Sequence, residues 1–213
     1  MRYDSRRPKP LIPRARVREI RGRLNVNGQE IEPVDEAGAV VAARELAEAG
    51  CVVLVVCLLH SYRNPIHENQ VSQLIADALP DLPVELSSRT WPQAREYERG
   101  LLSTINAYVR PAFENYLDIL IRGTKERGVG SEARVIRSNG GMQCASTIRQ
   151  HPVTALLSGP AAGVSAAATV AREAGWEGAN LVTVDVGGTS VDVGVVRDGR
   201  PVLSGEEHVA DFP

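Results

Sequence analysis

The sequence predicts an α/β fold, and this prediction depends on three observations. Residues 35–87 alternate between helical and strand-like patterns, which is typical of α/β proteins. The uncharged run CVVLVVCLL, from Cys51 to Leu59, is typical of a strand buried on both faces in a parallel sheet. Near the C-terminus, DVGGTSVD (Asp185 to Asp192) reads as strand, glycine turn, strand. With 43% hydrophobic residues, the 213-residue chain has enough apolar side chains for a core.

The first elements follow from turn and capping signals. Residues 1–15 look irregular, and Asn27-Gly28 predicts a hairpin turn between two short strands. Asp35 is placed to cap a helix that runs to Gly50. After the buried strand, Asn64-Pro65 starts a second helix that ends before Pro80. Residues 82–87 form a further short strand.

A long helical region is predicted from about Gln93 to Arg127, with Pro111 splitting or kinking it. Its apolar stripe consists of Leu101, Leu102, Ile105, Tyr108, Val109, Phe113, Tyr116, Leu117 and Leu120. A strand follows at 133–138, and a short helix lies around 145–150. Residues 158–175 predict a helix of very small side chains, capped by Ser158, which lets another backbone approach closely.

The glycine turn near the C-terminus is a candidate phosphate site. Gly187 and Gly188 make a tight turn where only glycine gives the backbone full freedom. The turn exposes backbone N–H groups, and Thr189 and Ser190 add hydroxyls. Carboxylates stand at both ends of this turn, and Mg²⁺ on a phosphate prefers oxygen ligands. The cofactor-binding candidates are Gly187, Gly188, Thr189 and Ser190, and the catalytic candidates are Asp185 and Asp192, with Asp185 also the metal ligand. The alternative is a plain glycine hairpin with a capping aspartate.

A second candidate contact is the turn after the strand at 133–138. Its residues are Ser138, Asn139, Gly140 and Gly141. Open α/β sheets commonly bind ligands at strand ends, so these residues are candidates for nucleotide or substrate contact. The alternative is an ordinary strand-to-helix turn.

Other polar residues have simpler readings. His60, His67 and Glu68 lack the spacing of a helical metal site, which favours loop anchoring and helix capping. Arg95 and Glu96 begin the long helix as part of a mixed-charge segment, which favours a solvated, self-paired helix start.

Composition argues against some classes of function. The net charge of −2 gives no general attraction to nucleic acid or to acidic membranes. The chain shows no signal peptide and no apolar run long enough to span a bilayer. Its three cysteines form no paired framework, and Cys144 reads as a small buried thiol, so a reducing cytoplasm is the expected compartment.

The chain resembles the hydantoinase A family, which includes ATP-dependent 5-oxoprolinases, N-methylhydantoinases and subunits of acetone and acetophenone carboxylases. The segments that carry the resemblance, in family order, are HSYRNPIHE (60–68), REYERG (95–100), NAYVRP (106–111), RSNGGM (137–142), LLSGPAAGV (156–164) and DVGGTSVDVGVVRDG (185–199). One departure is Ala162, where the family usually has a second glycine.

The resemblance implies a partial actin-like and sugar-kinase-like (ribonuclease-H-like) ATPase fold. Residues 1–34 would be a connector and hairpin, 35–157 the remainder of the first α/β domain, and 158–213 the connecting helix and first hairpins of the second. It also implies ATP and Mg²⁺ as cofactors, a small cyclic amide as substrate, and a B-type subunit or domain as partner in a hetero-oligomer. Arg95 and Glu96 resemble a segment near the family's catalytic cleft.

Family members open with a first phosphate loop that this sequence does not show, so we expect an internal piece of a larger protein. Three functions stay open. The chain is part of an ATP-dependent cyclic-amide hydrolase or ketone carboxylase, or a non-catalytic interaction module of that fold, or a carbohydrate-kinase or chaperone-like ATPase. The segments at 138–142 and 158–163 argue against the last.

Overall fold

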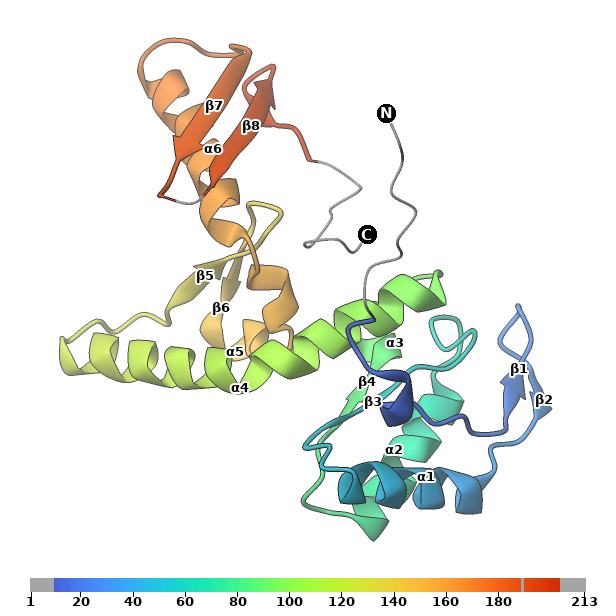
Figure 1. The fold of residues 1–213 in the computed structure, drawn as a ribbon. Helices are drawn as coiled ribbons and strands as arrows, with labels where there is room; N and C mark the ends of the chain where they lie inside the picture. The colour runs from blue at the N-terminus through green and yellow to red at the C-terminus, as the bar shows by residue number, and fades with distance from the viewer. Residues whose placement is uncertain (1–9, 189, 204–213) are drawn as a thin grey trace. The chain divides into compact units, whose positions relative to one another are not determined.

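A computed structural model describes residues 10–188 and 190–203 (Figure 1). The chain divides into two compact units at Tyr108/Val109, and each is described by itself. Thr189, a predicted phosphate contact, lies outside the described residues.

The first unit contains a small hairpin and a parallel strand pair with helices. Its elements are a 3-10 turn (Arg14–Arg16), β1 (Arg23–Leu24), β2 (Glu30–Glu32), α1 (Glu36–Glu48), β3 (Leu54–Val56), α2 (Ile66–Ala78), β4 (Val84–Leu86) and α3 (Ser87–Thr90). Strands β1 and β2 are antiparallel, and β3 pairs with β4 in parallel, Val55 opposite Glu85. The predicted helix-strand-helix-strand order of residues 35–87 is therefore confirmed, with shorter strands than expected.

Local signals explain these element boundaries. The Asp35 carboxylate accepts a hydrogen bond from the Gly38 N–H at 2.9 Å, which confirms the predicted cap of α1. Gly28, at φ +79°, adopts the left-handed conformation that the predicted hairpin turn needs. The core of the unit lies between α1, α2 and the strand pair, and it contains Val34, Ala39, Ala43, Leu54, Val56, Val71, Ile75 and Leu86.

The long helix α4 (Glu96–Glu126) starts in the first unit and continues into the second. Pro111 lies inside α4 without splitting it. The prediction that Pro111 splits the helix is therefore wrong. The predicted apolar stripe is also only partly right. Leu101 and Leu117 are buried, whereas Tyr108 and Tyr116 are 83% and 55% exposed. Apolar periodicity alone did not separate tyrosines that face solvent from the buried side of the helix.

The second unit contains two antiparallel sheets. Its further elements are β5 (Arg134–Ile136), β6 (Met142–Cys144), α5 (Ala145–Ile148), a 3-10 turn (Pro152–Ala155), α6 (Ser158–Glu173), β7 (Leu181–Val186), β8 (Val191–Arg197) and β9 (Arg200–Pro201). Leu117 of α4 packs with Ala145 and Ile148 of α5 in a small core. The strands β7, β8 and β9 form a meander.

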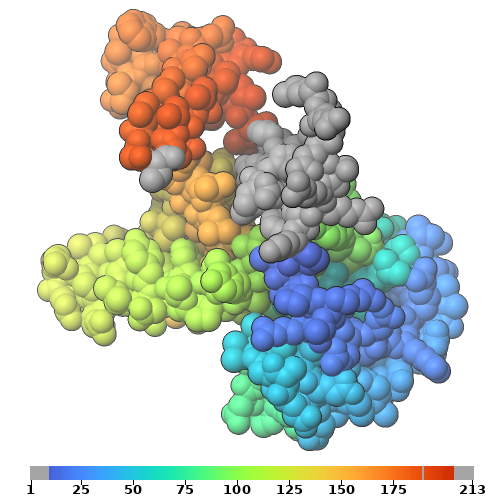
Figure 2. Space-filling view, in the orientation of Figure 1, coloured from blue at the N-terminus to red at the C-terminus, as the bar shows by residue number. Residues whose placement is uncertain are grey.

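The β7–β8 sheet has two different faces because successive side chains alternate across a strand. Gly194 marks the face covered by α6, since a Cβ placed there would lie 2.1 Å from Cγ2 of Val164. The opposite face carries valines in register pairs, Val182 with Val195, Val184 with Val193, and Val186 with Val191. All are exposed. In Figure 1 helix α6 passes behind the strands, and Figure 2 shows that no other element covers the side of the strands toward the viewer.

Candidate functional site

The predicted phosphate turn is the tip of the β7–β8 hairpin. Asp185 and Asp192 are direct register partners, so the two carboxylates stand side by side below the tip. Both belong to the α6 side of the sheet, because they alternate with the exposed valines. The Gly187 N–H donates to the Ser190 carbonyl at 2.9 Å and closes the turn. The structure thus brings Asp185, Gly187, Gly188, Ser190 and Asp192 together at one exposed end of the sheet.

The glycines of this tip are not required by local packing. Neither Gly187 nor Gly188 has a positive φ, so the expected need for glycine's backbone freedom is not seen there. A Cβ on Gly188 would meet nothing within 4 Å, and one on Gly187 would lie 3.5 Å from the nearest atom, the Ser190 carbonyl oxygen. The space beside the backbone is open, which is what a phosphate group approaching N–H groups needs.

The two aspartates fit Mg²⁺ bound together with a phosphate. Mg²⁺ usually keeps several waters and takes only one or two carboxylates when it binds a phosphorylated ligand. Asp185 is exposed and Asp192 is half-buried, so water can reach both. Among the described residues no group of three or more His, Cys, Asp and Glu could hold a metal ion by itself. A metal at this site would therefore depend on ligand oxygens as well as on the carboxylates.

The second predicted contact, Ser138 to Gly141, adopts a different structure from the one expected. It is the turn of the antiparallel β5–β6 hairpin and not a strand-to-helix turn, because residues 142–144 pair back on β5. The Asn139 side chain accepts from the Gly141 N–H at 3.0 Å, and Gly140 has φ +77°. The Ser138 N–H donates to the Thr154 carbonyl at 2.8 Å. These groups are used mainly to hold the turn.

Helix α6 contacts the β5–β6 turn and strand β8. A Cβ on Gly140 would lie 2.8 Å from Oγ of Ser165, and the preceding residue, Val164, faces Gly194 of β8. The prediction that small residues permit close approach is borne out at this contact. The predicted cap is wrong, because the N-cap is Leu157, at φ 57°, and Ser158 is the first helical residue. No side chain caps the helix.

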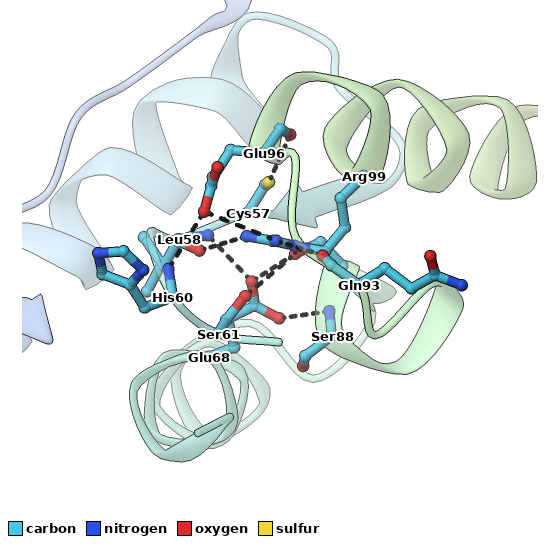
Figure 3. Close-up of polar contacts among 10 residues, drawn as sticks. Cys57, Leu58, His60, Ser61, Glu68, Ser88, Gln93, Glu96 and Arg99 are labelled. Carbon is cyan, nitrogen blue, oxygen red and sulfur yellow. Dashed lines mark hydrogen bonds and ion pairs between the residues drawn. The ribbon is translucent and has the colours of Figure 1, made fainter. Parts of the chain in front are cut away.

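The first unit contains a buried polar network that sequence reasoning missed (Figure 3). The side chain of Glu68 is fully buried and accepts hydrogen bonds from the Leu58 N–H (2.9 Å), the Ser87 hydroxyl (2.6 Å) and the Ser88 N–H (2.9 Å). Arg99, also fully buried, donates to Ser87 Oγ (2.9 Å) and to the carbonyls of Leu58 (2.6 Å) and Gln93 (3.0 Å). The Ser87 hydroxyl therefore connects the carboxylate to the guanidinium.

This network lies at the carboxyl ends of β3 and β4. Residues 57–60 follow β3, Ser87 and Ser88 follow β4, and the start of α4 closes the group. Buried charges are costly unless they are fully hydrogen-bonded, and here the bonds go mostly to backbone groups of these loops. The network consequently fixes the loop geometry at this edge of the sheet.

Two strained residues flank the network. His60 has φ 61° and Arg95 has φ 79°, and a non-glycine residue in such a conformation costs about 1–3 kcal/mol. The Glu96 carboxylate lies between His60 and Arg99, with its Oε1 3.5 Å from the His60 backbone nitrogen and 3.9 Å from Nη1 of Arg99. The exposed side chain of Arg95 lies 3.7 Å from the Glu98 carboxylate.

Cys57 borders the same network, and its thiol is not activated. Burial raises the pKa of the Cys57 thiol above its usual 9.0, and hydrogen bonding to Ser87 and the charge of Arg99 only partly oppose this. The thiol donates to the Glu96 carbonyl at 3.6 Å. It therefore remains protonated near neutral pH and serves as a packing group.

His67 and Glu68 have the anchoring roles that the sequence favoured. His67 is buried, and its Nε2 lies 2.8 Å from a carboxylate oxygen of Glu30, which links α2 to the β1–β2 hairpin. Glu68 contacts the loops after β3 and β4. One signal could have indicated this network. Arg99, Ser103 and Asn106 recur at helical spacing in α4 and are all fully buried, and a search for apolar periodicity overlooks such a polar stripe.

Comparison with known proteins agrees with this arrangement. The sequence model described as hydantoinase/oxoprolinase matches residues 99–213, and the one described as hydantoinase/oxoprolinase N-terminal region matches residues 1–79. The chain is 35% identical over 205 residues to the caprolactamase subunit alpha of Pseudomonas jessenii, covering 95% of this chain and 29% of that protein.

Two solved structures show the same fold. Nucleotide-free acetone carboxylase superposes with a TM-score of 0.86 at 27% identity over 97% of this chain and 29% of that one. The ATP-dependent caprolactamase from Pseudomonas jessenii superposes with a TM-score of 0.78 at 34% identity over 91% of this chain and 28% of that one.

The fold and the sequence together define a mixed α/β chain of the actin-like ATPase class. The protein belongs to the hydantoinase/oxoprolinase family. It spans less than a third of the length of the relatives described above. Within the described residues no helix is both long enough and apolar enough to cross a membrane.

Proposed function

We propose that this chain is the part of an ATP-dependent amide-opening enzyme subunit that binds nucleotide phosphate at the β7–β8 tip. One observation carries the proposal: paired carboxylates, Asp185 and Asp192, stand below a glycine tip where a Cβ on Gly188 would meet no other atom. Backbone N–H groups and the Ser190 hydroxyl would hold phosphate, and Asp185 would bind Mg²⁺ through oxygen or water. Asp192 would orient the metal or its water.

The proposed chemistry is activation of an amide by phosphorylation. An amide resists attack by water because resonance stabilises it, and transfer of a phosphoryl group to its oxygen removes that resistance. Mg²⁺, when bound, neutralises charge on the transferring phosphate. The residues of this chain would mainly position the phosphate and exclude alternative geometries. A cyclic amide such as a hydantoin or 5-oxoproline is the proposed substrate class.

The domain division is part of the same proposal. Residues 1–34 would form a connector and hairpin, 35–157 the remainder of a first domain, and 158–213 the connecting helix and first hairpins of a second domain. The contact of α6 with both the β5–β6 turn and β8 supports placing the junction at this helix. The relatives named as subunits support a hetero-oligomer, and we propose a B-type subunit or domain as the partner in the cytoplasm.

A ketone carboxylase is the second candidate function. The superposition on acetone carboxylase, over 97% of this chain, favours it as much as the caprolactamase similarity favours a hydrolase. Under this proposal both functions would share a first step, in which ATP activates an oxygen atom of the substrate. Product analysis of the complete enzyme with isotopically labelled bicarbonate separates the two functions, because only a carboxylase incorporates the labelled carbon into its product.

Calorimetric titration of the chain with Mg-ATP and Mg-ADP tests the proposal. We expect Gly188→Asp to abolish binding, because the added carboxylate repels phosphate and fills the open space beside the tip. Gly130→Asp is the matched control, since a Cβ there also meets nothing within 4 Å and the charge change is the same. A folded chain that binds neither nucleotide, or a Gly188→Asp variant that binds like Gly130→Asp, would favour a non-catalytic module.

A further inference from the structure

A cavity of the second unit lies away from the β7–β8 tip, and the function proposed above does not use it. Its volume is about 460 Å³, which is within the range of small-molecule sites. It is lined by one face of α6, by residues 176–179 and by the β8–β9 turn at 198–201. Leu181 pairs with Val196, whereas Val186 pairs with Val191 beside the tip, so the cavity and the tip are at opposite ends of the hairpin.

Backbone hydrogen bonds fix the walls of this cavity. The Trp176 N–H donates to the Ala171 carbonyl at 2.9 Å, and Gly175 has φ +85°, which is the Schellman ending of a helix. The Gly199 N–H donates to the Ala179 carbonyl at 3.1 Å and joins the loop after α6 to the β8–β9 turn. The side chains that α6 contributes include alanines, which are too small to fill the space between these walls.

Charged groups of both signs line the cavity. Arg172 and Arg200 supply guanidinium groups, and Glu177 and Asp198 supply carboxylates. All four residues are exposed, and none of them forms an ion pair within the part of the chain that the structure describes. A guanidinium binds a carboxylate through two parallel N–H donors, and a carboxylate attracts an ammonium group. The cavity therefore offers a partner to each end of a zwitterion.

Trp176 gives the two ends of such a ligand different places. It lines the cavity and is 65% exposed, so its indole is accessible to a ligand. The face of an indole ring attracts an ammonium group. Trp176 also follows the C-terminal end of α6, where the last carbonyl groups carry partial negative charge. The ammonium end of a ligand would therefore lie beside Trp176 and Glu177, and its carboxylate end would lie at Arg172 and Arg200.

We propose that this cavity binds a small amino acid in its zwitterionic form. Its regulatory meaning rests on the proposed function. Hydrolysis of a lactam breaks the C–N bond, adds the hydroxyl of water to the carbon and adds the proton to the nitrogen, so the product carries a carboxylate and an ammonium. The ring itself carries neither charge. A cavity with partners for both charges thus distinguishes the opened product from the ring, at a place separate from the nucleotide.

Tryptophan fluorescence of the chain, titrated with 4-aminobutyrate, tests the site without any requirement for turnover. We expect a saturable change with a dissociation constant on the order of 1 mM, because each exposed charge pair contributes little. Butyrate and butylamine, which carry one charge each, and 2-pyrrolidinone, the neutral ring, should bind at least about tenfold more weakly. Trp176→Phe should remove the signal, whereas a response that persists in this variant comes from Trp91 and overturns the proposal.

Arg200→Gln should weaken 4-aminobutyrate binding about tenfold, the effect of losing a hydrogen bond to a charged group. Arg197→Gln is the matched control, because Arg197 is the exposed register partner of Arg200 and does not line the cavity. The site is wrong if a folded chain gives no saturable response, if butyrate binds equally well, or if both variants bind alike. A parallel Mg-ATP titration separates the two proposals: nucleotide binding without a response to 4-aminobutyrate removes the amino-acid site and leaves the phosphate site standing.

Discussion

At the scale of single residues, Arg99 is the most consequential side chain of the first unit. Its guanidinium is fully buried and holds the loop after β3, the segment before α4 and the Ser87 hydroxyl together. The Glu68 carboxylate is removed from water in this position, and hydrogen bonds from the Leu58 and Ser88 N–H groups and the Ser87 hydroxyl make its burial tolerable. Glu68 and Arg99 together fix the loop geometry at the carboxyl ends of β3 and β4, and they do not add a large net gain in stability.

Arg99→Met should lower the free energy of unfolding by about 1–3 kcal/mol, because it leaves the Leu58 and Gln93 carbonyls without the donor that Arg99 supplies. Urea denaturation followed by circular dichroism measures the loss. Arg95→Met, four residues earlier and exposed, keeps the same residue types and should change stability by no more than about 0.5 kcal/mol. Equal effects in the two variants would mean that the network does not support the unit.

At the scale of elements, the packing of α6 on β8 depends on one glycine. A Cβ on Gly194 would overlap Cγ2 of Val164 at 2.1 Å and Oγ1 of Thr183 at 2.6 Å. Cγ1 of Val164 is also near, at 3.2 Å, so rotating the valine side chain does not clear the space. The small residues of α6 and this glycine together set how closely the helix approaches the sheet.

Gly194→Ala should therefore destabilise the second unit by about 1–3 kcal/mol, the usual cost of overpacking. Gly188→Ala, at the open tip of the same hairpin, should be almost neutral. Thermal unfolding of both variants gives the comparison. If Gly194→Ala and Gly188→Ala unfold at the same temperature, the helix is not closely packed on the sheet.

Sequence reasoning succeeded for elements whose signals are local. The Asp35 cap, the turn at Gly28 and the β7–β8 hairpin all follow from a few neighbouring residues, and the structure has each of them. Sequence reasoning failed where contacts between residues far apart in the chain determine the structure. Residues 142–144 form a strand because they pair with β5, and Tyr108 faces solvent although its spacing matches the buried stripe. Glu68, Ser87 and Arg99 are far apart in sequence, so the polar stripe of α4 could indicate that Arg99 is buried but not which residues it meets.

At the scale of the whole molecule, the valine face of β7–β8 is the largest departure from a self-contained fold. Val182, Val184 and Val186 on one strand and their register partners on the other are between 44% and 71% exposed. A contiguous exposed apolar patch of this kind marks a surface that normally packs against another one. The relatives described above are more than three times as long as this chain.

The central claim is that nucleotide phosphate and its metal bind at the β7–β8 tip. The most direct measurement is paramagnetic broadening of backbone amide resonances by Mn²⁺-ATP, with Mn²⁺ standing in for Mg²⁺. We predict selective broadening at Gly187 and Gly188, beside Asp185, and none at the Asp198–Gly199 turn, which lies at the other end of β8. Broadening at both turns, or at neither in a folded sample, would contradict the claim.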